Sequence, residues 1–127
     1  GAGGGAGGGA PPLGLRRLSS SRGSSGFFVG VTDRCMYSHT FQFGAGAPFT
    51  TGCTAVVEAR IYGSSLGPDD VLVDIDLVQR LLRSIMERYN HQNLDLLDEF
   101  REPRRNTTVE VVAQCVAQRL LEGLRGA

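Results

Sequence analysis

The stretch Asn90-His91-Gln92-Asn93-Leu94-Asp95-Leu96-Leu97-Asp98-Glu99-Phe100 connects two segments that have the apolar spacing of helices. It holds a lone histidine in a polar cluster, followed by apolar residues that alternate with carboxylates. Asn and Asp side chains commonly bond nearby backbone amides, so Asn93 and Asp95 are expected to hold a turn. The fold is predicted from the elements on either side of this connection.

Both neighbouring segments are predicted to be amphipathic helices. The first is expected to begin at Asp74 or Asp76, because an aspartate suits a helix N-terminus. The second is expected to begin at Thr107 or Thr108, where a following glutamate gives the spacing of a capping box, and to end at Gly123. The apolar stripes are Val78, Leu81, Leu82, Ile85, Met86 and Tyr89 in the first helix, and Val109, Val112, Ala113, Val116 and Leu120 in the second.

Two extended segments precede the helices. Residues 27–43 and 55–62 are rich in apolar and aromatic residues, and a Gly- and Pro-containing break at 44–48 separates them, which favours an antiparallel hairpin. The order strand, strand, helix, helix predicts an α+β domain in which two helices cover a strand pair. Because two strands alone form a marginal sheet, we expect this domain to need partners.

Composition predicts a small protein with one folded domain. The 127 residues carry a formal net charge of zero, so no global field points to nucleic acid or to a membrane. No apolar run approaches the ~18 residues of a spanning helix, and three cysteines fit no disulfide framework, so a soluble protein of the cytoplasm is expected. Residues 1–26, rich in Gly, Ala, Ser and Arg, are predicted to be a disordered tail before a domain at 27–127, with an organelle transit peptide as the alternative.

Five short motifs follow one another along the chain. They are Tyr37-Ser38-His39, Thr51-Gly52-Cys53, Val71-Leu72-Val73-Asp74-Ile75, Asn90-His91-Gln92-Asn93-Leu94-Asp95 and Asn106-Thr107-Thr108-Val109-Glu110. Their order and spacing resemble the family of 6-pyruvoyltetrahydropterin synthase and 6-carboxytetrahydropterin synthase. The resemblance implies the tunnelling fold, in which strand pairs and helix pairs assemble as trimers and hexamers around a β-barrel, with active sites between subunits.

The same resemblance assigns candidate site residues. It implies that His39 is a zinc ligand and that His91 transfers protons, with Asn90 in place of the aspartate that orients this histidine. Thr51 and Cys53 stand where two further zinc-binding histidines belong, so His39 and Cys53 are the candidate metal ligands. Catalytic zinc uses about three protein ligands, so zinc is a possible cofactor with an incomplete donor set.

Two further features of the family are missing from the sequence. The segment between His39 and Thr51 lacks the family's catalytic cysteine. Only residues 124–127 follow Gly123, so the predicted fold lacks the family's last two strands and the glutamate that anchors the pterin ring.

Two functions remain open at this point. The first is a lyase that eliminates triphosphate from dihydroneopterin triphosphate, with His91 as the proton shuttle. The second is a catalytically eroded relative that binds a pterin or purine or serves as a structural subunit. A third reading gives His91 no chemistry, since a histidine near a helix C-terminus is stabilised by the helix dipole. The resemblance implies a small-molecule pterin as partner and a homo-oligomer, a trimer or hexamer.

Overall fold

The computed structural model describes residues 14–19 and 25–126. In chain order the strands and helices are β1 (Gly14–Ser19), β2 (Ser25–Phe41), β3 (Phe49–Gly63), α2 (Ile75–Tyr89), α3 (Asp98–Arg101) and α4 (Val109–Arg125). Single 3-10 turns at Pro68–Asp70 and Leu94–Leu96 precede α2 and α3. No helix in the described part of the chain is both long enough and apolar enough to cross a membrane.

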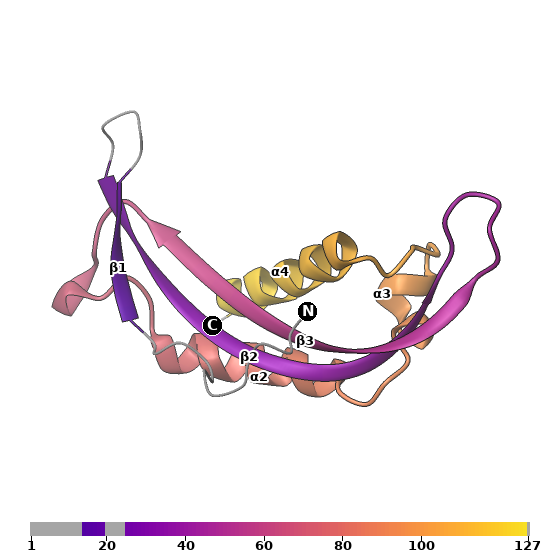
Figure 1. Cartoon of the computed structure of the whole chain (residues 1–127). Coiled ribbons are helices and arrows are strands. Elements are labelled where there is room, and N and C mark those ends of the chain that lie inside the picture. The colour runs from indigo at the N-terminus through magenta and orange to yellow at the C-terminus, as the bar shows by residue number, and fades with distance from the viewer. Residues whose placement is uncertain (1–13, 20–24, 127) are drawn as a thin grey trace, which may run out of the picture.

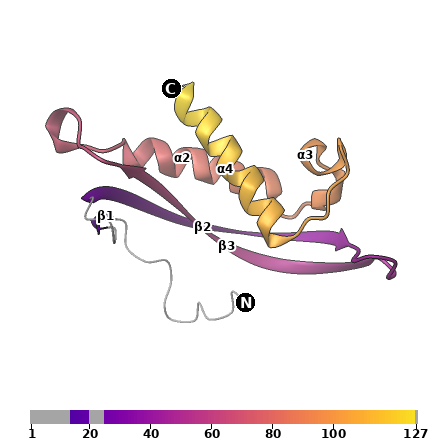
Figure 2. The ribbon, with the colours of Figure 1, turned by 90° about the horizontal axis from the view of Figure 1, so that it is seen from above.

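The described part of the chain forms one curved antiparallel sheet, two long helices, α2 and α4, and the short helix α3 between them (Figure 1). The strand order is β1-β2-β3, and the β2–β3 register runs from Phe27 opposite Gly63 to Phe41 opposite Phe49. Seen from above, α2 and α4 lie on the same side of the sheet (Figure 2). The predicted α+β architecture, a strand pair covered by two helices, is confirmed.

The strands differ from their predicted bounds. β3 begins at Phe49 instead of residue 55, because the backbone ladder continues through the polar segment that follows the break. Residues 14–19, predicted to belong to a disordered tail, form β1 and pair with the first part of β2. Composition missed this strand because backbone pairing with an existing edge does not require apolar side chains. The rest of the predicted tail, up to residue 24, lies outside the described residues.

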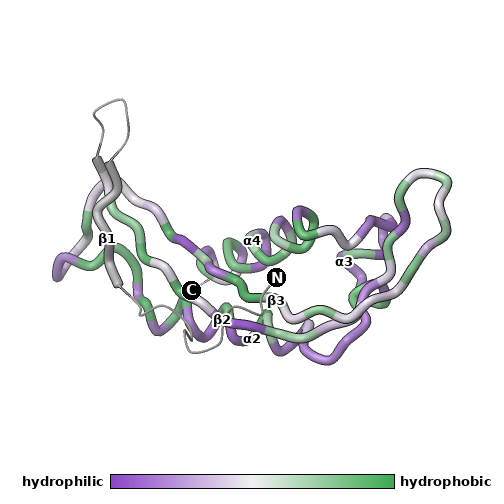
Figure 3. Tube along the Cα trace, viewed as in Figure 1, coloured by the Kyte–Doolittle hydropathy of each residue, from purple (hydrophilic) through white to green (hydrophobic). Residues whose placement is uncertain are grey.

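The core lies between β2 and the helices. Alternate residues of β2 point toward the helices, as the period of two requires, and meet the apolar stripe of α2. The buried residues of these two elements are Val29, Val31, Cys35 and Tyr37 from β2, and Val78, Leu82, Ile85, Met86 and Tyr89 from α2. In Figure 3 the apolar and polar residues of both helices alternate in bands, in agreement with the predicted amphipathic stripes.

A single side chain caps the first turn of each long helix, α2 and α4. The Asp74 carboxylate accepts from the backbone N–H groups at the start of α2, as predicted. The Thr108 hydroxyl caps α4 by accepting from the Val111 N–H, so the capping box that would begin at Thr107 is not formed.

The predicted stop at Gly123 is wrong, because α4 continues to Arg125. Gly123 instead marks a close contact between the helices. A Cβ atom at this position would lie 2.6 Å from the Leu81 side chain on α2. The glycine therefore allows α4 to approach α2 and is not a terminator.

The outer edge of β2 is covered by the connection between α2 and α4. From Met36 onward, the N–H groups at alternate residues donate to this connection. The bonds run from Met36 to Asn90 Oδ1 (2.9 Å), from Ser38 to Gln92 O (2.9 Å), from Thr40 to Asp95 Oδ2 (2.6 Å) and from Gln42 to Asn106 Oδ1 (3.1 Å). The stretch 90–106 thus provides hydrogen-bond acceptors for these outward N–H groups.

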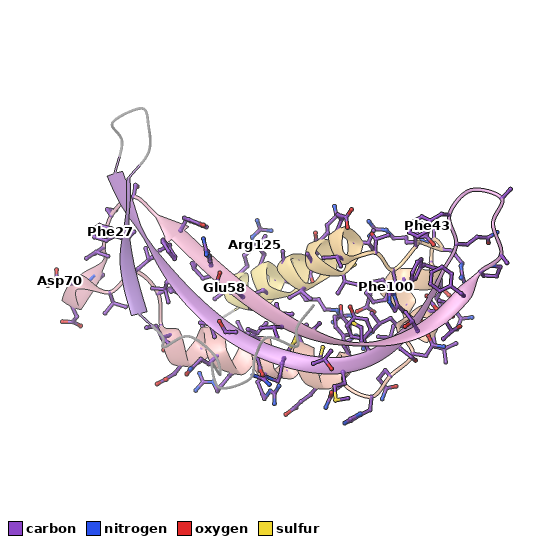
Figure 4. The ribbon with its side chains drawn as sticks, viewed as in Figure 1. Phe27, Phe43, Glu58, Asp70, Phe100 and Arg125 are labelled. Atoms are coloured by element: carbon purple, nitrogen blue, oxygen red, sulfur yellow. The ribbon has the colours of Figure 1, made fainter. Side chains whose placement is uncertain are left out.

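Glu99 ties the helices together from the solvent side of the core. Its carboxylate accepts hydrogen bonds from Arg88 and Tyr89 on α2 and from Arg119 on α4, at 2.6 to 3.0 Å. The neighbouring Phe100 is buried and packs near Tyr89, and Figure 4 shows it among the side chains gathered beside α3. Burial alone would raise the pKa of Glu99, but the bonds from Arg88, Arg119 and Tyr89 lower it to about 2.

We predict that Leu82→Ala lowers the free energy of unfolding by about 2 to 5 kcal/mol, because Leu82 is fully buried and its truncation leaves a cavity. Urea unfolding followed by circular dichroism measures the change. The exposed neighbour Ser84, changed to Ala, is the control and should unfold like the parent chain. Equal stability of the Leu82 variant would show that the α2 stripe is not the core contact.

Glu99→Gln should destabilise the protein at neutral pH but not in strong acid. A carboxyl whose folded pKa lies below its unfolded value contributes stability above the unfolded pKa, and this contribution disappears as pH falls through about 5 toward 2. The difference between parent and variant should be on the order of 2 kcal/mol at pH 7 and should shrink steadily below pH 4. Urea titrations at several pH values measure it, and a difference independent of pH would contradict the assignment.

Candidate functional site

A groove lies between β3 and α4. Its volume is about 820 Å³, and apolar side chains of both elements form most of its walls. Among them are Ala55, Val57 and Ile61 from β3, and Val112, Val116 and Leu120 from α4. Tyr37, His39 and Cys53 form its polar end. We call this the β3–α4 groove.

Strand register explains why these polar residues meet. Tyr37 lies directly opposite Cys53, and His39 lies opposite Thr51. Residues two apart on one strand share a face, so all four positions belong to the face that carries the helices. The structure therefore brings together His39 and Cys53, the two metal-ligand candidates of the sequence.

The His39 ring is held by a buried polar chain. Its Nδ1 lies 2.8 Å from the Thr107 carbonyl oxygen and 3.0 Å from the Thr107 hydroxyl. The Thr107 hydroxyl in turn donates to Asp95 Oδ1 at 3.4 Å, and the other Asp95 oxygen accepts the Thr40 N–H. Because a carbonyl can only accept, this contact places a proton on Nδ1, and Nε2 is the ring nitrogen that faces away from it.

Aromatic neighbours fix the orientation of the same ring. His39 lies between Tyr37, in edge contact at 5.5 Å, and Phe41, at 5.1 Å between ring centroids. Phe41 also packs against Phe49 across the hairpin and against Phe43. Figure 4 labels Phe43 near the hairpin tip, where it is largely exposed. The row of rings restricts His39 to one orientation at the groove end.

Sequence reasoning missed the part that Thr107 and Asp95 play here. Thr107 was considered only as a helix cap and Asp95 only as a turn residue, yet both are buried. Buried polar groups in proteins are almost always paired, and these two pair with each other and with β2. The signal available in the sequence was the position of Asp95 between two leucines, Leu94 and Leu96.

Asn90 and His91 occupy a different place. The Asn90 side chain accepts the Met36 N–H, and the His91 backbone N–H donates to the Met36 carbonyl at 2.6 Å. His91 is exposed, has a left-handed backbone (φ 59°) and does not line the β3–α4 groove. Among the described residues no hydrogen bond joins the two side chains, so here Asn90 serves the edge of β2.

Burial raises the pKa of two weakly acidic side chains on β2, Cys35 in the core and Tyr37 at the groove end. The pKa of the Cys35 thiol rises to about 11, mainly by burial and then by the nearby Cys53. The pKa of Tyr37 is raised above its usual range by burial first, and then by its hydrogen bond with Cys53 and by Cys35. Cys35 and Tyr37 are therefore protonated at neutral pH, and neither is an activated nucleophile.

The donor set does not fit a complete zinc site on this chain. Residues 14–19 and 25–126 hold no group of three or more His, Cys, Asp or Glu side chains arranged to bind a metal. His39 and Cys53 provide two donors, whereas catalytic zinc takes about three protein ligands and an open position. Thr51, opposite His39, offers only a hydroxyl.

A family model and a solved structure both relate this chain to 6-pyruvoyl tetrahydropterin synthase. The family model described as 6-pyruvoyl tetrahydropterin synthase matches residues 47–127. The solved structure of Caenorhabditis elegans 6-pyruvoyl tetrahydropterin synthase superposes with a TM-score of 0.65 at 12% sequence identity, covering 91% of this chain and 83% of that one. A search of curated proteins finds no match to the sequence.

Thr107→Val should keep the proton on His39 Nδ1, because the backbone carbonyl remains, while it removes the hydroxyl that links the ring to Asp95. The Thr107 hydroxyl, not its carbonyl, links His39 to buried Asp95, so the change leaves a buried carboxylate with one partner fewer and should cost about 1 to 3 kcal/mol. Nitrogen chemical shifts of the imidazole and thermal unfolding measure both effects. Thr51→Val, at an exposed strand position, is the control. Shifts that place the proton on Nε2 in this variant would contradict the assignment from the carbonyl.

Proposed function

The chain belongs to the 6-pyruvoyl tetrahydropterin synthase family, and from that premise we propose that it is a pterin-binding member with little or no lyase activity of its own. The observation that carries this proposal is the polar end of the β3–α4 groove. An oriented histidine remains there, but the donors that would complete a metal site are absent from the described residues.

His39 is the residue of this site that can still bind a polar ligand or accept a proton from it. With its proton on Nδ1 and bonded to the Thr107 carbonyl, its Nε2 can accept a hydrogen bond or a proton from a bound hydroxyl or ring N–H. Asp95 is linked to the ring through the Thr107 hydroxyl and helps to hold its orientation. This geometry suits recognition of a polar heterocycle, and it places one proton acceptor at the groove end.

Efficient elimination of triphosphate needs more than one proton acceptor. In the proposed site Cys35 and Tyr37 stay protonated, and the segment between His39 and Thr51 supplies no further cysteine. His91, the proton-transfer residue implied by family resemblance, has no carboxylate beside it, because Asn90 replaces the aspartate and bonds Met36 instead. An amide cannot stabilise an imidazolium by charge, and the equivalent loss in a serine-protease triad costs about 10⁴ in turnover.

A working synthase is the second candidate, favoured by family membership itself. In that case His91 would carry the proton transfers, and the assembly would be the trimer or hexamer implied for the family, with missing donors supplied across subunits. Binding and catalysis distinguish the two functions, because the first predicts a complex with a pterin without turnover.

We expect weak or absent release of triphosphate from dihydroneopterin triphosphate by the purified chain, together with measurable binding of a non-reactive pterin by calorimetry. His39→Ala should weaken this binding, whereas His91→Ala should not, and Asn90→Asp should not create activity. Metal analysis of the same sample should find less than one zinc per chain, since the described residues bring only His39 and Cys53 together as donors. Robust triphosphate release that His91→Ala abolishes would establish the synthase instead.

A further inference from the structure

A second hollow lies on α4, outside the β3–α4 groove. Its volume is about 330 Å³, large enough for a small ligand, and it shares no lining residue with the groove. It is formed by α3, by the loop that precedes α4 and by α4 itself. Among the residues that line it are Glu99, Arg105, Gln114, Cys115, Arg119 and Glu122. We call this the α3–α4 pocket.

Arg105 is held at the pocket wall from two sides. Its backbone N–H donates to the Phe100 carbonyl at 2.9 Å, and its guanidinium donates to Gln114 Oε1 at 2.7 Å and to Cys115 Sγ at 3.8 Å. Both side-chain partners are uncharged, and no carboxylate of the described residues lies within ion-pair distance of Arg105. The guanidinium is therefore half-buried, fixed in place and without a counter-ion in this part of the chain.

Arg119 brings a second guanidinium to the same pocket. Its Nε donates to Glu99 Oε2 at 2.8 Å, and its two terminal nitrogens have no hydrogen-bond partner within residues 14–19 and 25–126. The Glu99 carboxylate also accepts from Arg88 and Tyr89, so one carboxylate serves two arginines. A guanidinium presents its N–H groups in a planar fork that matches phosphate oxygens, and the terminal part of this fork is free on Arg119.

The charges converge on one buried thiol. Burial is the largest cause that raises the pKa of Cys115, whereas Arg105 and Arg119 lower this pKa and Glu99 raises it. All three charged groups therefore lie close to Cys115, whose buried side chain is part of the pocket lining. With Arg88 beside Glu99, cations outnumber carboxylates around this thiol.

The loop before α4 increases the positive potential. Residues 101–105 hold three arginines and one glutamate, and Arg101 and Arg104 are exposed. An excess of cations around a concave site attracts small anions and raises their local concentration. The wall is not uniformly cationic, because the exposed carboxylate of Glu122 also lines the pocket and accepts a hydrogen bond from Gln118 at 3.3 Å.

We propose that the α3–α4 pocket binds a small phosphate monoester with a hydroxylated body. Arg105 and Arg119 hold the phosphate, which supplies the missing counter-ion through strong charge-assisted hydrogen bonds. A phosphate group occupies only part of the pocket. The remaining wall carries the amide of Gln118 and the carboxylate of Glu122, which accept hydrogen bonds from hydroxyl groups of the body.

A carboxylate is the nearest alternative to the phosphate. It carries one charge and two oxygens, which a single guanidinium can satisfy in a bidentate pair. A phosphate monoester carries about 1.5 to 2 negative charges at neutral pH and three free oxygens, so it can engage both arginines at once. Two guanidinium groups in one pocket therefore favour the phosphate.

Isothermal titration calorimetry in a phosphate-free buffer tests the proposal, with glycerol 3-phosphate as the probe. We expect saturable binding of glycerol 3-phosphate and none of glycerol. Glycerate, which has a carboxylate in place of the phosphate, and inorganic phosphate, which lacks the body, should each bind at least about fivefold more weakly.

Arg105→Gln removes one cation of the pocket without breaking an ion pair. It should weaken binding of glycerol 3-phosphate at least about tenfold, because charge-assisted bonds to the phosphate are lost. Arg80→Gln is the matched control, since Arg80 is exposed on α2 and does not line the pocket, and this variant should bind like the parent chain. Nitrogen–proton spectra of the arginine Nε groups give a second measurement, in which Arg105 and Arg119 shift on titration and Arg80 does not.

Circular dichroism verifies that each variant is folded. A parent chain that does not bind glycerol 3-phosphate, or a folded Arg105→Gln chain that binds it undiminished, would overturn the proposal. Stronger binding of glycerate than of glycerol 3-phosphate would assign the pocket to carboxylates and overturn it as well. His39→Ala, which should weaken pterin binding, changes no residue of this pocket, so its failure and that of the proposed function are distinguishable.

Discussion

The hydrogen bonding of the β2 edge is the constraint on which the rest of the structure depends. A strand of 17 residues exposes many backbone donors, and each that is buried without a partner costs free energy. From Met36 onward, the stretch 90–106 supplies partners to alternate residues through Asn90, Gln92, Asp95 and Asn106. Those bonds fix the position of the connection between the helices, and the connection in turn sets where α4 begins.

The same bonds place the functional groups. Asp95 serves Thr40 on the β2 edge with one oxygen and Thr107 with the other, and Thr107 reaches His39 on the face of β2 that carries the helices. One carboxylate therefore connects edge protection to the orientation of the groove's histidine. Glu99 performs a parallel task at the helix ends, where it holds two arginines and a tyrosine from α2 and α4. Order at the candidate site is a consequence of how the connection is fastened.

Local patterns predicted the helices well and the tertiary roles of polar residues poorly. The period of Leu82, Ile85 and Val112 gave the buried stripes, and Asp74 gave the start of α2, because these are effects within one turn. Thr107 and Gly123 were assigned to helix ends by local rules, but a long-range hydrogen bond and a close helix contact decide their positions. The order of the motifs indicated the family. The position of His91 away from the β3–α4 groove could not be predicted, because it depends on the pairing of the stretch 90–106 with the edge of β2.

Stability and chemistry are separable in this fold, because the residues that fasten the scaffold are not the candidate metal ligands. The polar residues that fasten β2, such as Asp95 and Asn90, contribute backbone bonds that the folded chain cannot lose without leaving N–H groups unpaired. Positions 51 and 53 lie on β3 outside the fully buried core, with Thr51 exposed and Cys53 half-buried beside Tyr37. Replacement of a metal-binding side chain there costs little stability. Selection for the fold alone would therefore keep Asp95 and Thr107 and leave the donor positions on β3 free to change.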